Sequence, residues 1–127
     1  MAILCGVTAL AGHMFPVWLS FKGGKGVATG AGVIFALNWI AGLIALGVFL
    51  LVFLIWRYIS LSSILSAVTI AVAQVFTGER IWQDKALPVT VFCGMVALLV
   101  VVRHHANIRR LLKGEEKRFS FSKKNES

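Results

Sequence analysis

Acidic residues are the scarcest charged class in this chain of 127 residues, with five Asp and Glu against 13 Lys and Arg. They are Glu79, Asp84, Glu115, Glu116 and Glu126, and none lies inside a long apolar block. A proton-coupled transporter places carboxylates within the bilayer, and a carboxylate metal site or a buried Ser-His-Asp triad also needs them. The sequence therefore argues against all three, and we predict neither a metal nor a cofactor.

Metal-binding cysteines and alternating apolar residues are lacking as well. Cys5 and Cys93 lie in apolar blocks without partners at metal-ligand spacing, which indicates two buried hydrophobic side chains. No stretch alternates with period two, as the wall of a membrane β-barrel must. The net charge of +8 is confined to loops and the C-terminal tail. A nucleic-acid binder would instead spread it over a soluble face, so we predict no nucleic-acid partner.

Long uncharged apolar blocks dominate the chain, which is 58% hydrophobic. The blocks Val27–Trp56, Tyr58–Gly78 and Ala86–Val102 contain no charged residue. A transmembrane helix needs about 20 predominantly apolar residues. With a first helical segment from Ala2 to about Phe15, the blocks predict an all-α, polytopic membrane helix bundle.

The number of crossings in Val27–Trp56 follows from the positive-inside rule. If the block breaks near Asn38 into a short and a longer helix, every basic residue except Arg80 and Lys85 lies on one side. We therefore predict about five transmembrane segments, the first helix of this block being short or half-inserted against protein. The polar stretch Arg57–Ser63 is predicted to be a hinge.

A loop rich in glycine and lysine precedes the Val27–Trp56 block. It consists of Lys22, Gly23, Gly24, Lys25 and Gly26. Glycines can bring backbone N–H groups close to a ligand, the lysines add charge, and the helix that follows presents its N-terminus. The loop is either a phosphate cradle or a basic turn that anchors the chain to lipid headgroups. It is not a Walker A loop, because Leu19 and Gly26 stand where that pattern needs Gly and Ser or Thr.

A second polar cluster, Arg103–Glu116, follows the last apolar block. On a helix, His104 and Asn107 share a face with two apolar residues. An interfacial amphipathic helix would turn an apolar face to the lipid, which fits these two side chains poorly. The adjacent His104 and His105 point about 100° apart on a helix, so they cannot line one site equally.

Four motifs together carry a resemblance to a known family. They are Gly-His-x-Phe-Pro-Val (Gly12–Val17), Phe-Lys-Gly-Gly-Lys-Gly-Val-Ala-Thr (Phe21–Thr29), Tyr-x-Ser-Leu-Ser-Ser (Tyr58–Ser63) and Arg-His-x-x-Asn-Ile-x-Arg-Leu-x-x-Gly-x-Glu (Arg103–Glu116). With these motifs the chain resembles the bacterial acyl-phosphate:glycerol-3-phosphate acyltransferases of the PlsY type, over nearly its whole length. The resemblance favours the phosphate cradle over the headgroup anchor, and His104 over His105.

The resemblance implies a seven-helix enzyme of the bacterial inner membrane, with its active site on the cytoplasmic face. Such an enzyme transfers a fatty acyl group from acyl phosphate to glycerol 3-phosphate and yields lysophosphatidate, a step of phospholipid synthesis. His13, Ser60, His104 and Asn107 would line the catalytic site, and the loop Lys22–Gly26 would bind the substrate phosphate. An acyl phosphate is already activated, so the step needs orientation and charge neutralisation of two anions. The expected partners are these two substrates and membrane lipids.

The family's first motif, Ser-Gly-Asn-x-Gly-x-Thr-Asn followed by an arginine, has no counterpart in the sequence. We therefore expect residues 1–116 to be the C-terminal part of the acyltransferase domain, truncated at the N-terminus, and inactive alone. Residues 117–127 would form a basic cytoplasmic tail. The alternatives are an inactive remnant or lipid- or phosphate-binding membrane protein, and a small transporter of a phosphorylated solute. The sequence makes no prediction of acyl-chain preference or oligomeric state.

Overall fold

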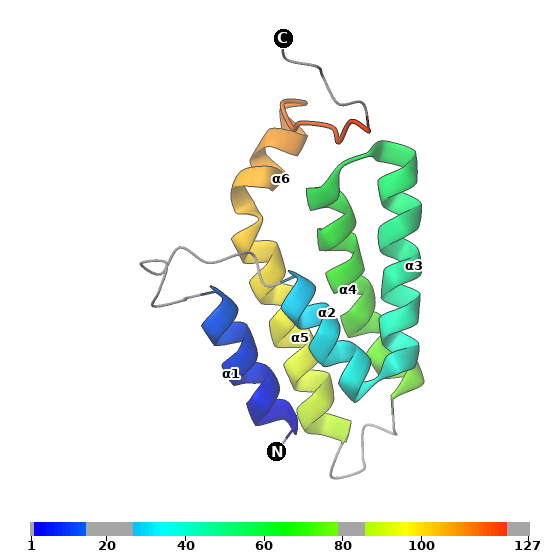
Figure 1. Cartoon of the computed structure of the whole chain (residues 1–127), viewed down its shortest axis with the longest axis vertical. Helices are drawn as coiled ribbons and strands as arrows, with labels where there is room; N and C mark the ends of the chain where they lie inside the picture. The colour runs from blue at the N-terminus through cyan, green and yellow to red at the C-terminus, as the bar shows by residue number, and fades with distance from the viewer. Residues whose placement is uncertain (1, 15–26, 79–85, 122–127) are drawn as a thin grey trace.

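The computed structural model describes residues 2–14, 27–78 and 86–121, and this part of the chain is built from helices alone. The helices are α1 (Ala2–Met14), α2 (Val27–Leu37), α3 (Trp39–Trp56), α4 (Ile59–Thr77), α5 (Ala86–Arg103) and α6 (His105–Leu112). In Figure 1, α1, α3 and α5 run towards the end of the bundle that carries α6, and α2 and α4 run back. The predicted all-α bundle is confirmed.

Two of these helices, α3 and α4, have the length and apolar composition of a membrane span. The pair α5 and α6, bent by 58° at their junction, adds a third if it is counted as one span. The helices α1 and α2 contain only 13 and 11 residues, fewer than the roughly 20 of a full crossing. The predicted short helix in the Val27–Trp56 block is therefore present.

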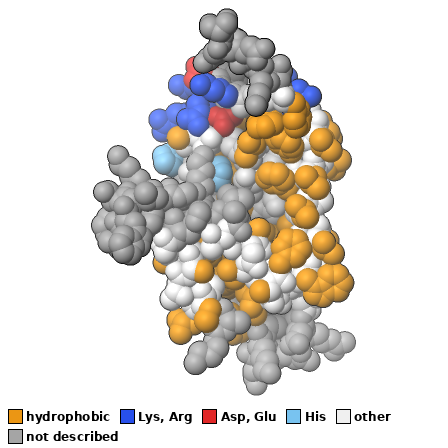
Figure 2. All heavy atoms as spheres, in the orientation of Figure 1, with side chains coloured by type: hydrophobic (Ala, Val, Ile, Leu, Met, Phe, Trp, Pro, Cys, Tyr) orange, Lys and Arg blue, Asp and Glu red, His pale blue; other side chains and the backbone are white. Residues whose placement is uncertain are grey.

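Large apolar side chains cover the outer surface of the bundle. On α3, Leu51 and Leu54 are exposed, as are Val72 on α4 and Leu98 on α5. Figure 2 shows hydrophobic side chains along the length of the bundle, with Lys and Arg gathered at the α6 end. In water such a surface would be costly, whereas lipid accepts it, and the charged end belongs at the headgroups.

Small residues line the contact between α3 and α4. Ala41 and Ala45 on α3 and Ala67 on α4 are buried, and Ser66 donates a hydrogen bond to the Ala45 carbonyl at 3.0 Å. Small side chains let two helix backbones approach closely, which is how helices pack in a membrane without a hydrophobic drive. This contact makes α3 and α4 a firm frame for the residues that lie between them.

Cys93 is buried in the core, as predicted, but the prediction for Cys5 is wrong because its side chain is exposed. Cys5 lies on α1, which packs at the edge of the bundle (Figure 1). On this helix Gly6 and Leu10 are buried, whereas the three residues between them are exposed. The polar stretch Arg57–Ser63 is likewise not a hinge throughout. Only Arg57, with a left-handed φ of 58°, and Tyr58 lie outside a helix.

The serines of this stretch belong to the first turns of α4. The hydroxyl of Ser62 donates to the Tyr58 carbonyl and that of Ser63 to the Ile59 carbonyl, each at 2.8 Å. These bonds to the preceding turn satisfy the hydroxyls inside the helix. The serine-rich stretch therefore forms the start of α4 and does not interrupt a helix.

Asn38 breaks the Val27–Trp56 block and ties α3 to α4. Its Oδ1 accepts from the Ala41 N–H at 3.1 Å as the N-cap of α3, and its Nδ2 donates to Gln74 Oε1 at 2.8 Å and Thr77 Oγ1 at 3.0 Å. A polar residue inside an apolar block thus closes the turn and caps a helix.

We expect Asn38→Ala to lower the free energy of unfolding by about 1–2 kcal/mol, because the cap is lost and Gln74 keeps no donor from α3. Thermal unfolding of the purified protein in lipid nanodiscs measures the change. Thr69→Ala is the control, because the Thr69 hydroxyl is exposed and bonds only within α4. Equal melting temperatures for the two variants would contradict this role of Asn38.

Candidate functional site

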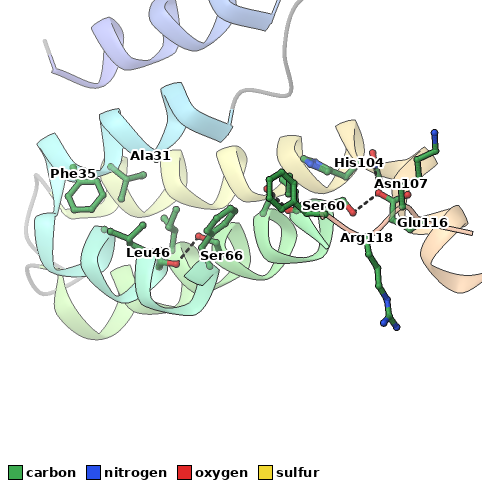
Figure 3. Close-up of a pocket in the computed structure, with 18 residues that line it drawn as sticks. Ala31, Phe35, Leu46, Ser60, Ser66, His104, Asn107, Glu116 and Arg118 are labelled. Atoms are coloured by element: carbon green, nitrogen blue, oxygen red, sulfur yellow. Dashed lines mark hydrogen bonds between the residues drawn. The ribbon is translucent and has the colours of Figure 1, made fainter. Parts of the chain in front are cut away.

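A pocket of about 740 Å³ opens between α2, α3, α4 and α6. Figure 3 shows its two ends: Ser60, His104, Asn107 and Glu116 lie at one, and Ala31, Phe35 and Leu46 at the other. The first end is polar and sits at the charged end of the bundle, whereas the second is apolar and lies deeper between α2 and α3. The pocket therefore suits a molecule with a polar head and an apolar tail.

Three side chains converge on the carboxylate of Glu116 at the polar end. Ser60 Oγ donates to Glu116 Oε1 at 2.8 Å, and Asn107 Nδ2 donates to the same oxygen at 2.7 Å. Arg110 Nε donates to Oε2 at 2.7 Å and forms an ion pair with it. The side chain of Glu116 is only 10% exposed, so this carboxylate joins α4 to α6 from within.

Gly114 brings Glu116 back under α6. It has a positive φ of 71°, a conformation that glycine adopts without strain after the end of a helix. The Glu115 N–H then bonds the Arg110 carbonyl at 2.8 Å. The chain thereby reverses within a few residues, and the Gly-x-Glu sequence places its carboxylate against Asn107.

His104 occupies the junction of α5 and α6 and is 2% exposed. Its Nδ1 lies 2.7 Å from the carbonyl oxygen of Val100. A carbonyl only accepts, so Nδ1 carries a proton, and in a neutral ring with this tautomer Nε2 is the acceptor nitrogen. His105 is exposed and is absent from the pocket lining, so of the two adjacent histidines only His104 lines the pocket.

Glu116 stays ionised in this setting. Burial raises the pKa of its carboxyl, but hydrogen bonds from Asn107, Arg110 and Ser60 and the charge of Arg110 outweigh that effect and lower the pKa from 4.5 to about 2. Its negative charge is held against the Arg110 guanidinium. Glu116 therefore orients Ser60 and Asn107 and is not available as a proton donor near neutral pH.

The residues after Glu116 cross from α6 to the α3–α4 turn. The Phe119 N–H donates to the Arg57 carbonyl at 2.7 Å, and Arg118 Nε donates to the Tyr58 hydroxyl at 3.1 Å. The ring of Phe119 packs against that of Phe53 with centroids 5.4 Å apart. We call residues 117–121 the strap; it appears in red in Figure 1 and forms one wall of the polar end of the pocket.

The pKa of Glu116 predicts when the strap comes loose. Because the folded pKa is lowered, the ionised carboxylate stabilises this region fully above pH 4.5, and the stabilisation is lost as the pH falls towards about 2. We expect the Phe119 amide, measured by hydrogen exchange and corrected for the intrinsic rate, to stay protected at pH 4 and to lose protection near pH 2. In Glu116→Gln the Phe119 amide should have low protection at both pH values. If this variant were as protected at pH 4 as the unaltered protein, the strap would not depend on the ionised Glu116.

Three of the predicted catalytic residues, Ser60, His104 and Asn107, come together in this pocket from α4, the α5–α6 junction and α6. The His13 side chain and the predicted phosphate loop Lys22–Gly26 lie outside the described residues, so their roles remain predictions. Within the described part of the chain, no group of three or more His, Cys, Asp or Glu could hold a metal ion.

Sequence reasoning missed Glu116 as a site residue. The signal was present, since Glu116 ends the Gly-x-Glu sequence of the Arg103–Glu116 motif. Its place outside the apolar blocks gives no indication of a role in the pocket. Its partner Ser60 lies 56 positions away, and no local pattern reveals such a contact.

Several known proteins are similar to this chain in sequence. The sequence model of the glycerol-3-phosphate acyltransferase family matches residues 1–114. A glycerol-3-phosphate acyltransferase of Prochlorococcus marinus is 41% identical over 122 residues, which cover 96% of this chain and 58% of that protein. The corresponding protein of Salinibacter ruber is 43% identical over 120 residues, with 94% and 52% covered.

Two solved structures are also similar to the chain, each with a TM-score of 0.84 and 37% identity. Both are crystal structures of PlsY, an integral membrane glycerol 3-phosphate acyltransferase, one in the glycerol 3-phosphate form and one in the lysophosphatidic acid form. The match covers 93% of this chain and 56% or 57% of those. The chain thus spans about half the length of the relatives it matches.

Proposed function

Because the chain belongs to the glycerol-3-phosphate acyltransferase family, we propose that its pocket transfers a fatty acyl group from acyl phosphate to glycerol 3-phosphate. The products are lysophosphatidate and inorganic phosphate. The observation that carries the proposal is the continuity of one pocket from the cluster of Ser60, Asn107 and Glu116 to an apolar end between α2 and α3. An acyl donor and the lysophosphatidate product have the same division into a charged head and a long apolar chain.

The acyl-transfer step needs little covalent assistance from the protein. The glycerol hydroxyl attacks the carbonyl carbon of the acyl phosphate, the bond from that carbon to the phosphate oxygen breaks, and the hydroxyl proton leaves with the phosphate. In the neutral ring His104 Nε2 is an acceptor; it takes the proton of the attacking hydroxyl as the new ester bond forms and returns it to the departing phosphate. Asn107 and Ser60, held by Glu116, orient the polar groups of the substrates.

The lysines and glycines of the loop Lys22–Gly26 supply the charge and N–H groups for the glycerol 3-phosphate phosphate in this proposal, and His13 completes the catalytic set. Their support is the motif alone. The family's first motif would serve the second anion. In an enzyme made of all these parts, the described pocket provides the acyl-binding half and the Ser-His-Asn cluster.

We place the polar end of the pocket at the cytoplasmic face of the bacterial inner membrane. The support is the concentration of basic side chains at that end (Figure 2). Arg109 and Arg110 on α6 and Lys113, which caps it, are all exposed. Basic residues flanking membrane spans are retained on the cytoplasmic side. Both substrates carry phosphate and would be soluble or interfacial there.

The test uses the completed protein, in which the 127 residues are joined to the part of the Prochlorococcus marinus relative that lies outside the matched region. We expect this protein to form lysophosphatidate from acyl phosphate and glycerol 3-phosphate, with release of one phosphate per ester. Asn107→Ala should reduce the rate, and Thr69→Ala should not. Binding of lysophosphatidate without turnover would instead support a lipid-binding protein.

A further inference from the structure

The ring of Phe35 lines the apolar end of the pocket. Ala31 and Phe35 lie one turn apart on α2, and Leu46 and Gly42 lie one turn apart on α3, so each turn of the pocket wall pairs one residue from each helix. At the first level Ala31 leaves the space open. At the next, the Phe35 ring fills it, and Figure 3 shows that ring farthest from Ser60.

The ring rests on Gly42. A Cβ added to Gly42 would lie 2.9 Å from Phe35 Cδ1 and 3.0 Å from Cγ. Real Cβ atoms hardly ever approach carbon so closely, so the position of the ring depends on the missing side chain. Phe35 itself is 37% exposed, which gives its ring room to move that a core residue lacks.

The residues around Phe35 are held more firmly than its ring. Ile34, its neighbour on α2, is 1% exposed in the core. Three residues beyond Phe35, Asn38 is held by hydrogen bonds to Gln74 and Thr77 of α4. A polar cluster held by hydrogen bonds therefore lies beyond the ring, and an apolar chain gains nothing by entering it.

We propose that Phe35, seated on Gly42, sets the maximum length of the acyl chain that the pocket accepts. This inference rests on the proposed function, because it assigns the apolar end to the acyl group. Removing the ring opens the pocket by about one helical turn, 5.4 Å, enough for about four more methylene groups. A methyl group added at Gly42 occupies space at the same level and displaces the ring, which shortens the pocket.

The experiment measures binding of lysophosphatidates of graded acyl length to the 127-residue chain in lipid nanodiscs. For the unaltered chain we expect affinity to rise with chain length and then to fall. For Phe35→Ala the optimum should move to longer chains by about four carbons, with about a tenfold gain for chains beyond the original optimum. For Gly42→Ala the optimum should move to shorter chains.

Phe76→Ala is the matched control, because it removes the same ring from an exposed position on α4 outside the pocket lining. Its length profile should equal that of the unaltered chain. An unchanged optimum in both Phe35→Ala and Gly42→Ala, with lysophosphatidate still bound, would overturn the role of Phe35 and leave the proposed function standing. If the unaltered chain binds no lysophosphatidate of any length, the inference about Phe35 fails, whereas the proposed function is decided separately by the activity of the completed protein.

Discussion

In the completed protein, His104→Ala is expected to lower the turnover number by about a hundredfold to ten-thousandfold, the usual contribution of a positioned proton-accepting group. The ring that it removes is buried and has its Nδ1 bonded to the Val100 carbonyl, which directs the acceptor nitrogen. The Michaelis constant for glycerol 3-phosphate should change much less, because the phosphate is bound elsewhere in this proposal. Steady-state assays of lysophosphatidate formation separate the two constants.

His105→Ala is the control for this substitution. It removes the same side chain one position along, where the ring is exposed and bonds the Val102 carbonyl at 2.9 Å. We expect its turnover number to stay within a factor of two of the unaltered protein, an estimate that follows from the small effect of surface substitutions. If His105→Ala lost as much activity as His104→Ala, the effect would come from the bend between α5 and α6 and not from the His104 ring.

The melting temperature of the His104 variants separates a loss of catalysis from a loss of folding. His104 is buried, so its removal can also loosen the α5–α6 junction. His104→Gln keeps a polar side chain of similar reach but offers no nitrogen that accepts a proton. A catalytic role predicts that His104→Gln regains the melting temperature lost in His104→Ala without regaining turnover.

The helical architecture could be predicted from the sequence because the signals are local. Uncharged apolar blocks specify helices in a membrane, and a polar residue such as Asn38 within one block marks its break. The charge distribution also favoured that break. That His104 and Asn107 face the same pocket could be predicted likewise, since the two lie three positions apart, although α6 itself begins only at His105.

Contacts between distant segments could not be predicted in this way. The Ser60 hydroxyl bonds the Glu116 carboxylate because α4 and α6 are neighbours in the bundle. The spacing of residues in the sequence does not indicate which helices are neighbours. The prediction that Arg57–Ser63 is a hinge was wrong for most of its length for another reason. Serine favours turns by competing for backbone groups, but in α4 the hydroxyls bond the preceding turn, and the helix begins at Ile59.

The contacts of the strap at the C-terminal end could not be predicted from the sequence either. Residues 117–121 are basic and aromatic, and composition alone assigns them to a tail. In the structure Phe119 and Phe121 pack on each other and on Phe53, and the Arg57 guanidinium lies 5.1 Å from the Phe121 ring centroid. Cation–π and aromatic contacts of this kind depend on which helix end lies nearby.

Glu116→Ala is expected to have the largest effect on stability, lowering the free energy of unfolding by about 2–4 kcal/mol. The carboxylate accepts three hydrogen bonds, and its removal leaves Ser60 and Asn107 without that acceptor in a buried place. Hydrogen bonds to a charged group and unsatisfied buried donors each have effects of this size. The contribution of Arg110 is smaller, because its side chain is 47% exposed and water can replace the lost partner.

Glu115→Ala provides the matched comparison, since Glu115 is the adjacent, exposed carboxylate, and its loss should change stability by less than about 0.5 kcal/mol. Glu116→Gln should fall between the two, because its amide oxygen can accept from Ser60 and Asn107 while its amide nitrogen faces the Arg110 donor. Denaturant titration in detergent orders the three variants. A Glu116→Gln protein as stable as the unaltered one would mean that the carboxylate's charge adds nothing, whereas equal stabilities of Glu115→Ala and Glu116→Ala would mean that the junction of α4 and α6 holds without it.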